Sequence, residues 1–364
     1  MKKIALMAFF GAILVIGISL QSIFSDQKTG DRTAAVSESV SPAFTAPVAA
    51  SQDLPSKKAL QIGYHVFQTF NNCAPAALSI TLSYYGIRAS QEELAADLRP
   101  YNNPKGINDD KSTPPEELTE KAREYGLIPY FRANGSIDLL RQFIANDIPV
   151  IVRTLLYPDK DYAHYRVIKG YDDTTKEIIQ DDSFEGKNLR FSYGKFEKLW
   201  QKFNYAYLIL VPRDKQEVIE AILGGDLDAA TSWRNALTKA EREIDINPDD
   251  ERARFNASVA AYYTGDYARA IEEFEKVEPT LPRLTLWYQM EPIEAYFELG
   301  DDRRVLSLTT EVLSGNVSYS ELYLLRGKVF LKQGNRERAR QEFEKALFYN
   351  KNSKTAIRAL DALD

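Results

Sequence analysis

Apolar residues recur every three or four positions in the second half of the stretch 68–86, which reads QTFNNCAPAALSITLSYYG. Asn71 and Asn72 precede this run as residue types that cap helices, and Pro75 suits a first turn, where its missing N–H costs nothing. A glycine ends the run. The pattern predicts a helix that begins near Cys73 and stops at the end of the stretch.

Helical and strand patterns follow one another over the next 130 or so residues. We expect amphipathic helices at 90–98, 115–125, 136–146 and 196–203. We expect strands at 148–155, 165–168, 177–180, 191–193 and 205–211. Helices followed by an antiparallel sheet of about five strands form an α+β layout, with a cleft between the helical side and the sheet. The expected rims of that cleft are the loops 101–115 and 157–163.

Glycine followed by Asp or Asn interrupts the helical patterns of the C-terminal part at regular intervals. Three such pairs begin at Gly265, Gly300 and Gly334, so they are 35 and 34 residues apart. This spacing is the period of tetratricopeptide repeats, in which helix pairs stack into a solenoid. An earlier pair, Gly225-Asp226, marks an expected first copy, and a capping helix is expected at the C-terminus.

The solenoid has two possible uses. Its concave groove is suited to a peptide or protein partner, or else the repeats only pack on the preceding domain and cover its sheet. Trp233, Trp287 and Tyr288 are candidate anchors in the groove, although aromatic residues at helical spacing also fit a core.

The N-terminal segment 1–24 carries Lys2 and Lys3, followed by an apolar run from Ile4 to Phe24. About 20 apolar residues are enough to span a bilayer. A basic start before such a run predicts an export signal. It would remain as a single-pass anchor in the cell membrane, with the folded part outside the cytoplasm, or be cleaved to release a secreted protein.

Composition divides the rest of the chain. Residues 25–58 are rich in Ser, Ala, Thr, Pro and Val and predict a flexible linker. The domains expected after it span 59–213 and 214–364. The 46 basic and 52 acidic residues leave no basic footprint for nucleic acid. One cysteine excludes an internal disulfide, and with only two histidines a zinc site is not expected, nor is any cofactor.

A set of reactive side chains stands out from this background. Cys73 at a helix start would feel the positive end of the helix dipole, which favours the thiolate, and Gln68 offers an amide to an oxyanion beside it. His164 opens a predicted hairpin whose second strand ends in Asp181 and Asp182, so a carboxylate would lie beside the imidazole. The order glutamine, cysteine, histidine, acid is the papain-like arrangement.

The cysteine and the second histidine also have structural interpretations. A lone cysteine near an alanine-rich helix is often a small buried hydrophobe. His65, the second histidine, has no carboxylate pattern around it and is expected to be structural or solvent-facing.

The motifs carry a family resemblance. The stretch 68–86, HYRVIKGYDD at 164–173 and DDSFEG at 181–186 resemble the motifs of cysteine peptidases related to the bacteriocin-processing, double-glycine-leader family. Over about residues 60–350, including LPRLTLWYQMEPIEAYF in the repeat half, the chain resembles bacterial proteins that join such a domain to tetratricopeptide repeats.

The resemblance implies a papain-like fold and a role for each residue. Cys73 would be the nucleophile, His164 the base, an aspartate after the second strand the orienting group, and Gln68 part of the oxyanion hole. The family pattern of Asp, then Pro or Ser, then Gly three residues further on favours Asp182 over Asp181. The family usually has Cys-Gly-Pro, whereas this chain has Ala74 after the cysteine, and its methyl group is expected to narrow the site.

Two classes of function remain open. The first is an exported, membrane-tethered thiol peptidase that cleaves peptides or proteins presented by the repeats. The alternative is a binding or scaffold protein whose peptidase-like domain is inactive, for which Ala74 is the main argument. An acyl transferase or amidase would use the same Cys-His-Asp site.

Overall fold

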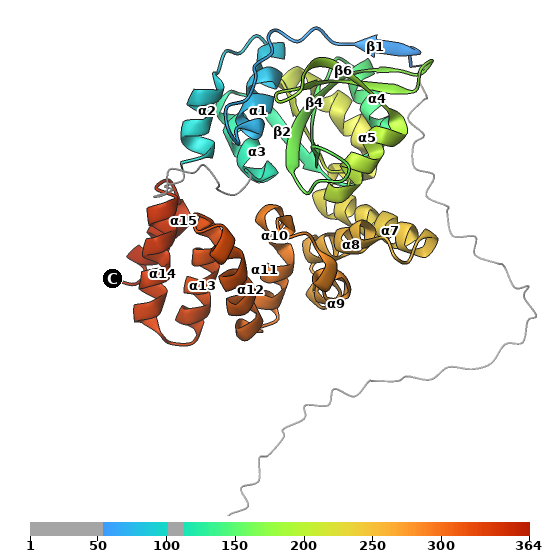
Figure 1. The fold of residues 1–364 in the computed structure, drawn as a ribbon. Coiled ribbons are helices and arrows are strands. Elements are labelled where there is room, and N and C mark those ends of the chain that lie inside the picture. The colour runs from blue at the N-terminus through green and yellow to red at the C-terminus, as the bar shows by residue number, and fades with distance from the viewer. Residues whose placement is uncertain (1–53, 101–112) are drawn as a thin grey trace, which may run out of the picture. The chain divides into compact units, whose positions relative to one another are not determined.

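The computed structural model describes residues 54–100 and 113–364 (Figure 1). The expected signal or anchor, 1–24, lies outside the described residues, as do most of the linker 25–58 and most of the loop 101–115. Within the described ranges, no helix combines the length and the apolar character needed to cross a membrane.

Helices and strands alternate in the N-terminal region much as the sequence patterns predict. The helices are α1 (Cys73–Tyr84), α2 (Gln91–Leu98), α3 (Pro115–Glu124), α4 (Ile137–Ala145) and α5 (Tyr193–Trp200), which continues into the 3-10 turn η1 (Gln201–Phe203). The strands are β1 (Lys57–Ala59), β2 (Ile128–Arg132), β3 (Val150–Leu155), β4 (Ala163–Asp172), β5 (Glu177–Asp182), β6 (Gly186–Ser192) and β7 (Tyr207–Val211).

The seven strands form one antiparallel sheet in the order β2-β7-β3-β4-β5-β6, with β1 also paired to β4. The expected count of about five strands is therefore too low. Strand β4 extends beyond its pairing with Val150, the first residue of β3, and β1 pairs with this extension at Gly170–Asp172, where backbone groups would otherwise lack partners. Because β1 begins at Lys57, the chain is ordered before the expected end of the linker at residue 58.

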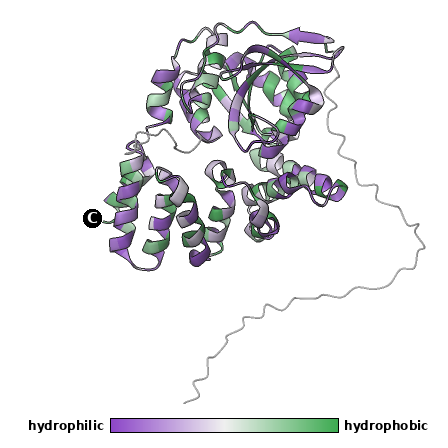
Figure 2. Cartoon of the chain, viewed as in Figure 1, coloured by the Kyte–Doolittle hydropathy of each residue, from purple (hydrophilic) through white to green (hydrophobic). Residues whose placement is uncertain are grey.

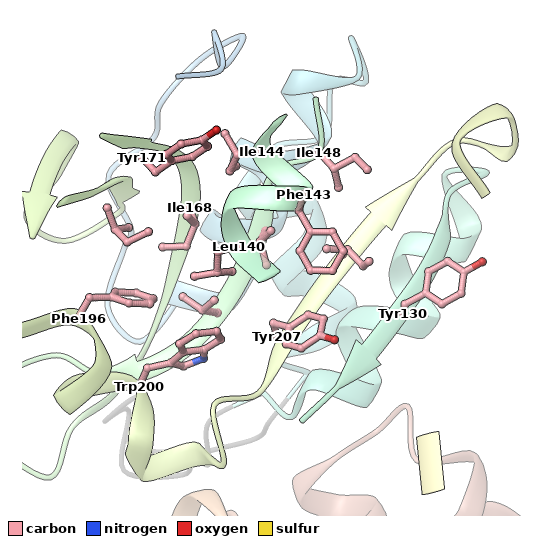
Figure 3. Packing of buried hydrophobic residues seen from close by; sticks show 14 of the residues in the cluster. Tyr130, Leu140, Phe143, Ile144, Ile148, Ile168, Tyr171, Phe196, Trp200 and Tyr207 are labelled. Atoms are coloured by element: carbon pink, nitrogen blue, oxygen red, sulfur yellow. The ribbon is translucent and has the colours of Figure 1, made fainter. Parts of the chain in front are cut away.

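Helices cover both faces of the sheet, whereas the sequence suggested a single helical side. Apolar side chains of α1, α2 and α3 pack with Ile151 of β3 on one face. On the other face, α4 and α5 pack with Val150 and Val152, as the two-residue period of a strand requires. Figure 3 shows this second core, in which the ring of Phe143 lies near that of Tyr207, with centroids 5.6 Å apart.

The C-terminal region is entirely helical. Its helices are α6 (Gln216–Leu223), α7 (Ala229–Ile246), α8 (Glu251–Tyr263), α9 (Tyr267–Val277), α10 (Thr285–Tyr288), α11 (Glu291–Glu298), α12 (Asp302–Gly315), α13 (Ser320–Lys332), α14 (Arg336–Tyr349) and α15 (Lys354–Asp361). Hydrophobic and hydrophilic residues intermix along these helices (Figure 2), as amphipathic packing requires.

The regularly spaced glycines lie in the turns between paired helices. Gly265, Gly300 and Gly334 have φ values of +81°, +79° and +76°, a conformation that a residue without Cβ adopts at little cost. Each is followed by a residue whose side chain caps the next helix by accepting a backbone N–H bond. The pair at Gly225-Asp226 differs, since it lies in a 3-10 turn and Asp228 caps α7 instead.

Helix α6 departs from the expected domain boundary at 213/214. Its buried residues, Ile219 and Leu223, belong to the core of the sheet and not to the core of the repeats. We therefore propose that the boundary between the two domains lies after α6, in the turn before Asp228.

The middle repeat, whose turn is at Gly300, comprises α10, α11 and α12, and its first helix is broken into two pieces. Helix α10 ends at Tyr288, two residues intervene, and α11 begins with Pro292 in its first turn. A proline lacks the N–H that a continuous helix would need at that position, so the helix restarts there. The break separates the short α10 from the rest of its repeat.

The contact between Gly327 and Phe343 tests the packing of the last repeat. A Cβ at Gly327 in α13 would overlap the ring of Phe343 in α14, whereas one at Gly194 in α5 would meet nothing within 4 Å. We expect Gly327→Ala to lower the free energy of unfolding by about 1–3 kcal/mol. Gly194→Ala, also in a helix, should leave it unchanged or raise it by up to about 1 kcal/mol. Urea denaturation followed by circular dichroism measures both, and equal effects would contradict this account.

Candidate active site

Cys73 is the first residue of α1, a helix whose residues from Cys73 to Ser83 are all buried. Asn72 stands at the N-cap, but its side chain does not cap the helix. Its Oδ1 accepts a bond from Arg99 at 3.1 Å, and its Nδ2 donates to Thr69 at 2.7 Å. The expected capping is therefore wrong, since these side chains hold the asparagine away from the backbone N–H groups beside the thiol.

His164 and Asp182 meet across the hairpin of β4 and β5. The imidazole Nε2 lies 2.8 Å from Asp182 Oδ1, and the two side chains are 3% and 0% exposed. In the register, Arg166 is opposite Asp182, and His164 lies two residues earlier on the same face of β4. The backbone N–H groups of Phe184 and Glu185 donate to the same Oδ1 at 2.7 and 3.0 Å, so the carboxylate is held in place.

The thiol and the imidazole are coupled. Burial raises the pKa of Cys73, but a side-chain hydrogen bond with His164 and the charge of the imidazolium lower it, and the net direction is down. Burial lowers the pKa of His164, but its bonds with Asp182 and Cys73 raise it, and the net direction is up. Since Nε2 is bonded to Asp182, Nδ1 is the nitrogen that faces Cys73. These shifts favour a thiolate–imidazolium pair.

Arg166 is a residue of this network that the sequence reasoning missed. Its side chain is fully buried, and its Nε lies 2.9 Å from Asp182 Oδ2. Burial raises the pKa of Asp182, but the bond to His164 and the charges of His164 and Arg166 lower it well below its usual range. The signal in the sequence was the strand alternation, because Arg166 follows the histidine by two positions.

Asp181 points to a different partner. Its carboxylate forms a buried ion pair with Lys169 at 2.8 Å and accepts the backbone N–H of Asn188. Successive residues of a strand face opposite sides, so only one of two adjacent aspartates can contact the imidazole. That residue is Asp182.

Gln68 is anchored by Ser183, a residue of the DDSFEG motif, and by Gln91, which the sequence patterns did not single out. Its Oε1 accepts a hydrogen bond from Ser183 Oγ at 2.9 Å, and its backbone N–H donates to the Ser183 carbonyl. The side chain of Gln91 clamps the backbone on either side, at Phe67 and Thr69. Because Oε1 is already bonded, the Nε2 hydrogens are the donors that this side chain can offer to an oxyanion.

His65 lies close to this network without joining it. Its Nε2 is 3.0 Å from the backbone carbonyl of Asp182, and its ring packs edge-on against Phe67. These contacts are with backbone and an apolar ring, which suits the structural role expected from the sequence.

Cys73, His164 and Gln68 line one pocket with a volume of about 640 Å³. Ala74 is not among its lining residues, because its side chain is 2% exposed and packs into the core between α1 and the sheet. The expected narrowing of the site by this methyl group is therefore wrong.

The remaining candidates divide between pocket and core. Loop 157–163 contributes Tyr162 and Ala163 to the pocket. Trp233 and Trp287 are buried in the core of the repeats, and Trp287 also lines the pocket, together with Tyr288. Within residues 54–100 and 113–364, no group of three or more His, Cys, Asp or Glu side chains is arranged to hold a metal ion.

Comparison with known proteins agrees with this architecture. Residues 57–208 match the model of the peptidase C39 like family, and residues 320–353 match a tetratricopeptide repeat model. The chain thus combines a C39-like peptidase domain with tetratricopeptide repeats, and the predicted resemblance is confirmed. The predicted fold, an α+β papain-like domain followed by an all-α repeat solenoid, is confirmed as well.

Several solved structures are similar to parts of the chain. A C39-like peptidase from Bacillus anthracis is 18% identical, with 43% of this chain and 98% of that chain covered and a TM-score of 0.36. The peptidase domain of Streptococcus ComA, a bifunctional ABC transporter involved in quorum sensing, is 24% identical, with coverages of 41% and 97% and a TM-score of 0.32. A tetratricopeptide repeat protein from Thermus thermophilus is 27% identical, with coverages of 39% and 77% and a TM-score of 0.32. No curated protein matches.

The shifted pKa values predict a pH profile for the thiol. Cys73 should be alkylated by iodoacetamide at a pH below that at which a free thiol ionises, because its pKa is lowered. In Asp182→Asn, the imidazolium loses its carboxylate and becomes easier to deprotonate, so it supports the thiolate less. The acid limb of the profile should then move up by about one pH unit or more.

Asp181→Asn is the matched control for this measurement. It removes a neighbouring carboxylate that pairs with Lys169, and the profile should keep its position. A profile that moves equally in both variants would contradict the coupling between Asp182 and the thiol.

Proposed function

We propose that this protein is a thiol peptidase that cleaves peptide or protein substrates. The observation that carries the proposal is the chain of contacts from Cys73 through His164 to Asp182, opening into one pocket. A nucleophile, a base and an orienting acid within hydrogen-bonding reach are the arrangement that acyl transfer from an amide requires. The match of residues 57–208 to a peptidase family supports the same assignment.

The first half of the reaction forms an acyl enzyme. The Cys73 sulfur attacks the scissile carbonyl carbon, and the carbonyl oxygen takes up the negative charge. The Gln68 amide and the Cys73 backbone N–H stabilise this oxyanion. The C–N bond then breaks, and the His164 imidazolium gives its proton to the departing amine. A thioester on Cys73 and a neutral imidazole remain.

The second half returns the enzyme to its starting state. Neutral His164 takes a proton from water, whose oxygen attacks the thioester carbon, and the C–S bond breaks to release a carboxylic acid and the thiolate. Asp182 keeps Nδ1 of the ring aimed at the sulfur throughout. An acyl transferase would use the same residues with an amine in place of water, so the chemical identity of the product separates the two reactions.

Export and partner binding are further parts of this proposal. Lys2, Lys3 and the apolar run 4–24 support export and a membrane anchor, and sedimentation of the protein with membranes would test it. The repeat match at 320–353 supports a protein partner or substrate bound by the solenoid.

Replacing the nucleophile or the base tests the enzymatic activity. On a peptide library, Cys73→Ala should abolish cleavage, and His164→Ala should lower its rate by about 10²-fold or more because the proton transfers are lost. Mass spectrometry of the products should find new carboxylic acid termini. His65→Ala, which removes the other histidine, should cleave at a rate close to that of the unchanged protein. Alkylation of Cys73 that is slow and indifferent to His164→Ala would favour an inactive scaffold.

The role of Gln68 is tested by the loss of one oxyanion donor. Gln68→Ala should lower kcat by about 10²–10³-fold with little change in KM, because an oxyanion exists only near the transition state. Ser183→Ala removes only the bond that orients the amide and should cause a smaller loss. Cleavage by Gln68→Ala with an unchanged kcat would exclude the assigned role.

A further inference from the structure

The pocket around Cys73 is built from two domains. The peptidase domain supplies the reactive groups, while Leu284, Trp287 and Tyr288 come from the repeat region, at and just before α10. These three residues lie more than a hundred positions after His164 in the chain. The broken helix of the middle repeat therefore forms a wall of the pocket that holds the nucleophile.

Apart from the reactive pair, the described residues that line this pocket are mostly apolar, and its other polar residues, Gln68, Thr69 and Asn71, are uncharged. Among the described residues, none of those that line it is Asp, Glu, Lys or Arg. Phe70, Tyr162 and Phe184 also line it, yet they are 64%, 51% and 54% exposed. Large exposed rings around a concave site are typical of surfaces that are covered by a ligand. A carboxylate or ammonium side chain of a substrate would find no Asp, Glu, Lys or Arg partner among these residues.

Hydrogen bonds fix the wall to the loop that leads to His164. The Tyr288 hydroxyl donates to the backbone carbonyl of Asp161 at 3.0 Å, and Thr285 Oγ1 donates to the Asp161 carboxylate at 3.3 Å. The buried Lys202 donates to the same threonine at 3.1 Å. The wall is therefore tied by hydrogen bonds to the segment that precedes the base.

Arg153 contacts the wall through Tyr288. Arg153 is 6% exposed as a residue. Its guanidinium donates to the Tyr288 carbonyl at 3.2 Å, and lies 5.8 Å from the centre of the Tyr288 ring and 4.8 Å from that of Phe203. An arginine held between aromatic rings contributes both a donor and a cation–π contact. It positions the backbone from which Leu284 and Tyr288 reach the pocket.

We propose that the wall formed by Leu284, Trp287 and Tyr288 selects a bulky apolar side chain of the substrate, adjacent to the bond that is cleaved. The proposal rests on the proposed peptidase function and adds its substrate class. The repeats then act as part of the enzyme, since they determine which peptide sequences fit beside Cys73. Leu284 makes the simplest probe, because it is half-buried at the edge of the repeat core, whereas Trp287 is buried within that core.

The test compares electrophiles that react with Cys73 in the full chain. Two peptidyl chloromethyl ketones report on the pocket. They are identical except for one residue, Leu or Asp, next to the residue that carries the chloromethyl ketone. Iodoacetamide reports on the thiol alone. We expect the Leu compound to inactivate at least tenfold faster than the Asp compound, since apolar contacts give discrimination of this order. Leu284→Ala should reduce this ratio about fivefold, and the iodoacetamide rate of the same variant reports any change in the thiol itself.

Two further variants sharpen the test. Leu299→Ala replaces a leucine that is 54% exposed on the same repeat and does not line the pocket, so the ratio should stay the same. Leu284→Lys introduces a cation and should shift the preference toward the Asp compound. Circular dichroism of each variant checks that the fold is retained.

The possible failures are distinguishable. Equal rates for the two compounds, or a ratio unchanged in Leu284→Ala and Leu284→Lys, would overturn the selective wall. The proposed peptidase function would still hold if iodoacetamide alkylated Cys73 more slowly in His164→Ala than in the unchanged protein. If the iodoacetamide rate were the same in His164→Ala as in the unchanged protein, the proposed peptidase function would be excluded. The proposed selectivity of the wall, which rests on that function, would then be excluded too.

Discussion

The carboxylate of Asp182, buried between an imidazole and a guanidinium, is the constraint on which the site depends. His164 and Arg166 approach its two oxygens at 2.8 and 2.9 Å, and all three side chains are at most 3% exposed. Removing charges from water is costly, and a buried ion without its partner lowers the stability of the fold by several kcal/mol. In the thiolate–imidazolium state that the pKa shifts of Cys73 and His164 favour, the charges alternate in sign from thiolate to imidazolium to carboxylate to guanidinium. This alternation offsets the cost, because each buried charge has an opposite neighbour.

This chain of charges requires two elements to be positioned independently. The hairpin of β4 and β5 holds the base and the acid through strand register, and the sheet core keeps that register because a slip by one residue would invert every side chain. The thiol sits at the start of a helix buried along nearly its whole length. Each component is thus located by a large apolar core, and the reactive groups meet where the two elements converge.

The repeats extend this arrangement. Their helix pairs bury small residues and aromatic rings against each other, as in other stacked repeats. The break before Pro292 separates the short α10 from α11. Trp287 of α10 still packs in the repeat core, and hydrogen bonds from α10 to Asp161 tie it to the loop before His164. A departure from the repeat pattern thereby coincides with a contribution to the pocket.

The sequence by itself determined the features that depend on local pattern. Helical spacing and glycine turns determined α1 and the repeat period, and the order of Gln68, Cys73, His164 and the aspartates indicated the kind of site. Tertiary structure decided what depends on partners distant in the chain. Only strand register decided that Asp182, and not Asp181, contacts the imidazole. Only the packing of the buried side chains placed Arg166 beside that carboxylate and Ala74 in the core. The pairing of β1, the side taken by α6 and the wall at Tyr288 carry no local signal, because each is stabilised by contacts with residues tens to more than a hundred positions away.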